Sequence, residues 1–125
     1  MKYTNIVLID DDIDDQEIFC DALAQVAQKV TCTALSNAKD ALRQLEEKVI
    51  TPDAIFLDLN MPIMNGEEFL KRIKMNQELE KIPVIIFSTS ANPSTIAATM
   101  KMGAIDFITK PSSYNALVQI LTPIF

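Results

Sequence analysis

Five short apolar runs alternate with stretches of helical periodicity along the chain, and this alternation limits the fold more than any other feature. The runs are rich in aliphatic and β-branched residues and cover Asn5–Ile9, Val30–Leu35, Ala54–Leu57, Val84–Phe87 and Ala104–Ile108. Runs without polar alternation are typical of strands that are buried on both faces of a parallel sheet. Strict strand–helix alternation therefore predicts an α/β fold with a doubly wound five-stranded parallel sheet and helices on both faces.

The chain has the size and composition of one folded domain. It contains 125 residues, of which 49% are hydrophobic and only 6% aromatic, as in an aliphatic α/β core. It begins without a charged and apolar leader, and no apolar run approaches the roughly 20 residues that span a bilayer. We expect a single cytoplasmic domain over residues 1–125, with no membrane association and no output domain.

The cysteines and the charges exclude further classes. Histidine is absent and Cys20 and Cys32 are the only cysteines, which excludes the usual zinc spacings and favours two reduced, packed thiols. The net charge of −6 equals the six acids found between Asp10 and Glu17, because the other eleven of the seventeen acids match eleven bases. Without a basic stripe, we expect no binding to nucleic acid.

Polar residues follow four of the predicted strands directly. Asp10 and Asp11 follow the first strand, Asp58 the third, Ser88 and Thr89 the fourth, and Lys110 the fifth. The carboxyl ends of parallel strands share one edge of the sheet, where open α/β sheets bind ligands. Singly, Asp58 or Ser88 would be read as a loop cap and Lys110 as a surface cation. Because they meet at one edge of the sheet, together they predict a functional site.

Three converging carboxylates would raise one another's pKa unless a cation holds them ionised. An incomplete set of oxygen ligands suits Mg²⁺, which retains water molecules. Lys110 and a strand-end hydroxyl would then meet the oxygens of a phosphoryl group. The chemistry that fits is phosphoryl transfer onto an aspartate.

These motifs, with Asp58-Leu-Asn-Met-Pro62, Ile63-Met-Asn-Gly66 and Lys110-Pro111, resemble the receiver domain of bacterial two-component response regulators over the whole chain. The resemblance implies the flavodoxin-like strand order 2-1-3-4-5, which is that of chemotaxis receivers. It implies that Asp58 accepts a phosphoryl group from a phosphohistidine of a histidine kinase or phosphotransfer protein, or from a small acyl phosphate.

The resemblance also implies roles for the surrounding residues. Asp11, Asp58 and the backbone carbonyl of Asn60 would bind Mg²⁺ directly and Asp10 through water, while Lys110 and Ser88 would contact the phosphoryl group. The Lys110–Pro111 bond would be cis, since proline narrows the trans preference to about 0.5–1 kcal/mol. Phe107 would be either an aromatic switch coupled to Ser88 or a core residue of the fifth strand. Thr89, next to Ser88, leaves open which hydroxyl acts. Asp12 is assigned to helix capping.

A receiver of this kind has no activity beyond its own phosphorylation and dephosphorylation, and it signals through a surface. By the resemblance, the first candidate is the face of the fourth helix, fifth strand and fifth helix, which would bind a downstream protein or a second copy of the chain.

Three alternatives remain open. Asp10-x-Asp12 loosely fits the nucleophile motif of haloacid-dehalogenase-like phosphatases, although the chain lacks room for a cap domain. A receiver fold used as an inert docking module conflicts with the intact set of acids, hydroxyl and lysine. A flavodoxin-like cofactor binder conflicts with a first loop made of carboxylates, where a phosphate would need a cage of amides.

Overall fold

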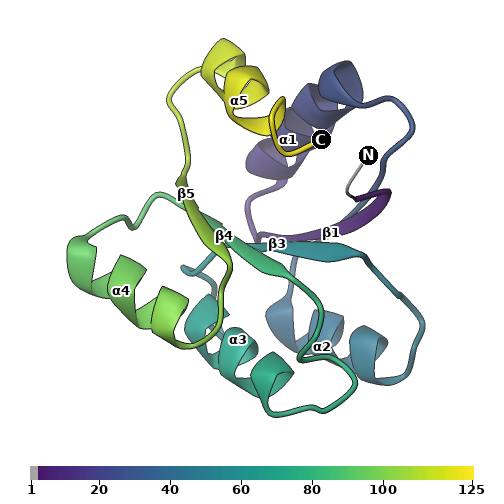
Figure 1. Ribbon diagram of the computed structural model, residues 1–125, viewed down its shortest axis with the longest axis vertical. Coiled ribbons are helices and arrows are strands. Elements are labelled where there is room, and N and C mark those ends of the chain that lie inside the picture. The colour runs from purple at the N-terminus through teal and green to yellow at the C-terminus, as the bar shows by residue number, and fades with distance from the viewer. Residues whose placement is uncertain (1–2) are drawn as a thin grey trace.

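The computed structural model describes residues 3–125, which form a central parallel sheet between two layers of helices (Figure 1). The strand order β2-β1-β3-β4-β5 confirms the predicted doubly wound, flavodoxin-like topology. In chain order the elements are β1 (Asn5–Ile9), α1 (Ile13–Val26), β2 (Thr31–Leu35), α2 (Ala38–Glu46), β3 (Ala54–Leu57), α3 (Gly66–Lys74), β4 (Val84–Ser88), α4 (Pro93–Lys101), β5 (Asp106–Thr109) and α5 (Tyr114–Leu121).

The strands match the apolar runs with small differences at their ends. β5 begins at Asp106, later than the predicted Ala104, because its pairing with β4 starts at Ile85 and Asp106. Ser88 belongs to β4 and lies opposite Thr109, so it is fixed by the sheet and does not begin the loop. The three inner strands are almost completely buried, as their unbroken apolar sequences predict.

Alternate residues of the strands divide the core into two halves. Ile6 and Leu8 of β1 face the layer of α1 and α5, whereas Val7 and Ile9 face the layer of α2 and α3. On the first side, the ring of Phe19 from α1 lies 5.1 Å from that of Phe56 and 5.3 Å from that of Phe87. Full burial of one such ring contributes about 2–3 kcal/mol, so this cluster fixes α1 on the sheet.

Each helix begins at a residue whose side chain accepts a hydrogen bond from a backbone amide of the first turn. The five N-caps are Asp12, Asn37, Asn65, Asn92 and Ser113. Asp12 accepts from the amide of Asp15, which confirms its assignment to capping. Asp10 and Asp11 precede this cap residue, so the capping of α1 does not use their carboxyl groups.

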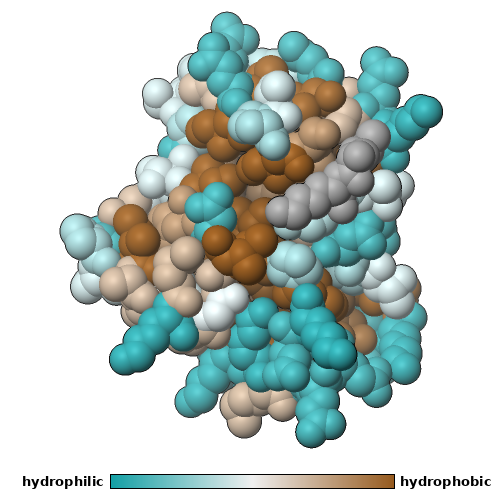
Figure 2. Space-filling view, in the orientation of Figure 1, coloured by the Kyte–Doolittle hydropathy of each residue, from teal (hydrophilic) through white to brown (hydrophobic). Residues whose placement is uncertain are grey.

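The surface differs between the two layers. On the face seen in Figure 2, hydrophobic residues gather across the middle and upper part of the molecule, while hydrophilic residues cover the region of α2 and α3. Among residues 3–125, no helix combines the length and apolar character that a membrane crossing requires.

Candidate functional site: an acid cluster at the carboxyl edge of the sheet

The sheet itself positions the two buried acids of the site. Beyond the last paired residue of β1, the amide of Asp10 donates to the carbonyl of Leu35 at 3.0 Å. Beyond β3, the amide of Asp58 donates to the carbonyl of Ile9 at 2.9 Å. The ladder hydrogen bonds therefore continue through both aspartates, and neither backbone is free to move with a loop.

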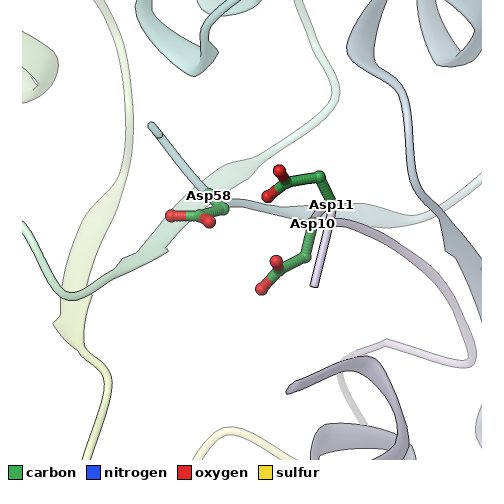
Figure 3. A group of neighbouring side chains, drawn as sticks. All are labelled: Asp10, Asp11 and Asp58. Atoms are coloured by element: carbon green, nitrogen blue, oxygen red, sulfur yellow. The ribbon is translucent and has the colours of Figure 1, made fainter. Parts of the chain in front are cut away.

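Asp10, Asp11 and Asp58 bring their carboxyl groups together (Figure 3). One oxygen from each lies within 4.8 Å of the others, and Asp10 and Asp58 are buried while Asp11 is exposed. Buried and exposed oxygen ligands at this spacing suit a hard divalent cation that keeps some of its water. The predicted convergence of the strand ends is confirmed.

Lys110 lies at the centre of the acids. Its Nζ donates to Asp10 Oδ2 at 2.7 Å, to Asp15 Oδ2 at 2.8 Å and to Asp58 Oδ2 at 3.4 Å, and its side chain is only 10% exposed. Burial by itself would lower the pKa of Lys110, but the bonds to Asp10 and Asp15 outweigh it, and the pKa is raised. Lys110 therefore stays protonated, and its ammonium group is held in place by the acids around it.

Burial is also the largest influence on Asp10, whose pKa is raised from its ordinary value. The bond from Lys110 and the bond from the Asp12 amide, 3.0 Å from Oδ1, oppose this shift. The charge of Asp58 contributes least. Repulsion between the acids, which the sequence led us to expect as the main influence, is thus smaller than the cost of removing Asp10 from water.

The turn after β3 packs tightly against Asp58. Asp58 Oδ1 accepts from the amide of Leu59 at 2.8 Å, and the amide of Gly66 donates to the carbonyl of Leu59 at 3.0 Å. A Cβ atom at Gly66 would overlap the carbonyl oxygen of Asp58 and lie 2.8 Å from the Cα of Leu59. Only glycine permits this approach, so the turn from Met61 to Gly66 also holds Asp58 in place.

The two neighbouring hydroxyl groups at the carboxyl end of β4 differ in burial. Ser88 is fully buried, with its Oγ 3.3 Å from the amide of Ser90, whereas Thr89 is exposed. Of the two, Ser88 is the one the sheet holds at the carboxyl edge. Ser90 Oγ also accepts from Asn60 Nδ2 at 2.6 Å, which links the loop after β3 to the loop after β4.

Pro111 and Phe107 are the remaining residues for which the resemblance implies a special role. Every described peptide bond is trans, so the expected cis bond between Lys110 and Pro111 is wrong. Trans remains the lower-energy isomer before proline by about 0.5–1 kcal/mol, and Lys110 reaches its three acids with it. Phe107 is partly buried against the core between the sheet and α2–α3, and its role as a switch stays a prediction.

Two residues of α1 also belong to the site, and sequence reasoning misses them. The run of acids around Asp15 is typical of a helix start, but the Asp15 carboxylate accepts a hydrogen bond from Lys110. Gln16 is buried, and its amide group donates to the carbonyl of Asp10 and to Ser36 Oγ. A surplus of acids over the needs of one cap, and an amide on an apolar helix face, were the available signals.

Known proteins are similar to this chain in sequence and in fold. The model of the response regulator receiver domain matches residues 6–122. A glutamate methylesterase/glutamine glutaminase of Clostridium acetobutylicum is 36% identical over 114 residues, which cover 89% of this chain and 32% of that protein. The chain thus spans about a third of the length of this relative.

Two solved structures extend the comparison. The phosphorylated cyanobacterial phytochrome response regulator RcpA superposes with a TM-score of 0.87 at 31% identity, covering 98% of this chain and 91% of that one. The Mn²⁺-bound response regulator Rcp1 superposes with a TM-score of 0.85 at 28% identity, covering 97% and 91%.

A doubly wound sheet with an acid cluster and a lysine at its carboxyl edge defines a signalling domain whose site fits phosphorylation and a divalent cation. The chain belongs to the response regulator receiver domain family, and its role lies in two-component phosphorelay signalling.

Proposed function

We propose that Asp58 is the residue that accepts the phosphoryl group. The observation that carries this proposal is the position of its carboxylate, buried beside the Lys110 ammonium group and within the acid cluster. Oδ2 would attack the phosphorus of the donor, a new O–P bond would form, and the bond to the leaving nitrogen or oxygen would break with its electrons. The Lys110 ammonium group then lies beside the incoming negative charge.

The cation we propose for this site is Mg²⁺, held by Asp11, Asp58 and the backbone carbonyl of Asn60, with Asp10 acting through water. When bound, Mg²⁺ would supply positive charge that neutralises the phosphoryl oxygens. Asp10 has both oxygens engaged, by Lys110 and by the Asp12 amide, which supports an indirect role for it.

The donor we propose is a phosphohistidine on a histidine kinase or phosphotransfer protein, because this chain contains no histidine of its own. We also propose that the protein acts in the cytoplasm. Ser88 would turn its hydroxyl toward the phosphoryl group and Phe107 would follow, which shifts the population of two existing states. The face of α4, β5 and α5 is our candidate for a downstream partner or a second copy of the chain.

Intact mass after incubation with acetyl phosphate tests the acceptor. We expect one phosphoryl adduct in the wild type that requires Mg²⁺ and is lost in Asp58→Asn. Asp53→Asn is the matched control, because Asp53 precedes β3, binds Thr4 and Asn5, and should leave the adduct intact.

Two outcomes would contradict the proposal. An adduct that survives in Asp58→Asn but disappears in Asp10→Asn would move the nucleophile to the end of β1 and favour a phosphatase-like site. No adduct with acetyl phosphate or with a phosphorylated phosphotransfer protein would favour an inert docking module.

A further inference from the structure

Cys20 of α1 and Cys32 of β2 lie side by side on the far edge of the sheet from β5. Their Sγ atoms are 3.1 Å apart, both residues are free thiols, and both are partly exposed. The sequence predicts packed, reduced cysteines in a helix and a strand, but nothing in their separation along the chain predicts that the two sulfurs meet.

Both backbones are firmly placed, so the contact is a property of the fold. Cys32 lies opposite Ile6 in the ladder between β1 and β2, and it packs against the core beneath α1 and α5. Cys20 follows the fully buried Phe19 on α1. A disulfide requires an S–S distance of about 2.05 Å, which small side-chain rotations at both residues can provide from the observed contact.

We propose that Cys20 and Cys32 are a redox modification site, which forms a reversible intramolecular disulfide when the protein meets a peroxide. The Cys20 thiolate attacks one peroxide oxygen and the O–O bond breaks. The hydroxide that leaves takes up the proton that the Cys20 thiol has lost, so a sulfenic acid and water are formed. The Cys32 thiol then attacks the Cys20 sulfur, the S–O bond breaks, and a second water leaves with the remaining proton. Two thiols are oxidised and one hydrogen peroxide is reduced to two waters.

The thiols differ in the way this sequence of steps requires. The hydrogen bond from Cys32 lowers the pKa of Cys20 to about 7, against the opposing effects of burial and of the nearby Asp21. The same contact, together with burial, raises the pKa of Cys32. Because the thiolate is the nucleophile, Cys20 is the attacking residue and Cys32 the resolving one.

The disulfide would strengthen an existing connection between α1 and the end of β2, which also contacts the site proposed for phosphorylation. Gln16, one turn before Cys20 on α1, donates to the carbonyl of Asp10 and to Ser36 Oγ just after β2. The disulfide would add a covalent link between the same two elements. The disulfide would close a short loop and restrict the unfolded chain. We therefore expect the thermal midpoint of unfolding to rise by roughly 10 °C.

Disulfide mapping of the wild type after hydrogen peroxide treatment tests the proposal directly. Lys29 lies between the two cysteines, so trypsin places them in the separate peptides 3–29 and 30–39. We expect these two peptides to be linked after oxidation under non-reducing conditions and to separate after dithiothreitol. Neither thiol should react with iodoacetamide in the oxidised protein.

Two variants separate the roles of the thiols. In Cys32→Ser, Cys20 should accumulate as a sulfenic acid that dimedone traps. In Cys20→Ser, Cys32 should stay reduced and peroxide should not raise the thermal midpoint, although all methionines are still present. Two alkylatable thiols in the oxidised wild type, linkage only between chains, or Cys20 sulfinic acid without linked peptides would overturn the proposal.

Discussion

Lys110 contacts three acids, one more than the two buried aspartates at the site proposed for phosphorylation. Asp10 and Asp58 belong to the acid cluster, whereas Asp15 comes from the first turn of α1 and contacts the same ammonium group. Asp15 is about one-third exposed, so its contact with Lys110 is partly screened by water. We therefore expect Asp15 to act mainly through its charge near the phosphoryl group and only weakly on stability.

Asp15→Asn should make phosphorylation by acetyl phosphate about two- to fivefold faster. The amide can still accept from Lys110, but a negative charge that repels the anionic donor is removed, which corresponds to about 0.5–1 kcal/mol in a wet site. Phosphorylation rates at low and high salt are the measurement, because the gain should shrink as salt screens the charge.

Asp14→Asn is the matched control, since it removes the same charge from the adjacent, exposed position of the helix. It should change the rate less than Asp15→Asn. A slower reaction in Asp15→Asn would show that its carboxylate orients Lys110 productively, and an equal gain in both variants would show a general effect of net charge.

Residue types and positions revealed the site's members at strand ends but not those on the helix. Asp10, Asp58, Ser88 and Lys110 are predictable because the end of a parallel strand fixes where the next residue goes. The contact of Asp15 with Lys110 depends on the angle at which α1 leaves the sheet, and that angle is set by the packing of Phe19 on Phe56 and Phe87. Helical periodicity does not determine this angle, so the contact between Asp15 and Lys110 could not be predicted from the sequence.

Among the elements, the turn between β3 and α3 is the most constrained. The amide of Met64 donates to the carbonyl of Pro62 at 2.8 Å, and the residue between them, Ile63, has a φ of 69°. A three-residue turn with a positive central φ is rare and strained, and a β-branched residue fits it poorly. Ile63 is also 81% exposed, so burial of its side chain does not compensate for the strain.

Ile63→Gly should raise the free energy of unfolding by about 0.5–1 kcal/mol. Relief of the left-handed conformation is worth about 1–2 kcal/mol, and the greater freedom of glycine in the unfolded chain removes part of that gain. Urea denaturation monitored by circular dichroism measures the difference.

Val49 provides the comparison, because it is also β-branched and exposed but lies outside the left-handed region. Val49→Gly should lower the free energy of unfolding by about 0.5–1 kcal/mol. If Ile63→Gly is destabilising by a similar amount, the turn is not strained at this residue.

At the scale of the whole molecule, the carboxyl edge of the sheet contains a group of charged side chains, which the surrounding elements keep in place. The burial of the strands and their alternation with helices were predictable from hydrophobic periodicity, whereas the order of the strands was predictable only from the resemblance to receiver domains. The meeting of Cys20 and Cys32 was not predictable, because it depends on three-dimensional packing. The trans bond before Pro111 is the ordinary isomer, and the cis bond was expected only from the resemblance.

We expect the acid cluster to make the stability of the whole domain depend on a bound cation. A cation that binds only the folded state stabilises it by about 2.7 kcal/mol at a hundred times its dissociation constant. For a domain of this size, we expect Mg²⁺ to raise the thermal midpoint by roughly 10 °C relative to EDTA at matched ionic strength. Differential scanning calorimetry measures this shift.

Asp11→Asn should abolish most of the shift, because it removes the exposed oxygen ligand while Asp10 and Asp58 keep their contacts with Lys110. Asp12→Asn removes the same charge one residue further along, and asparagine caps a helix as well as aspartate does, so this variant should keep the shift. If both variants lose it equally, Mg²⁺ is attracted only to the general negative charge before α1. If only Asp11→Asn loses it, the cation binds at the predicted carboxylates.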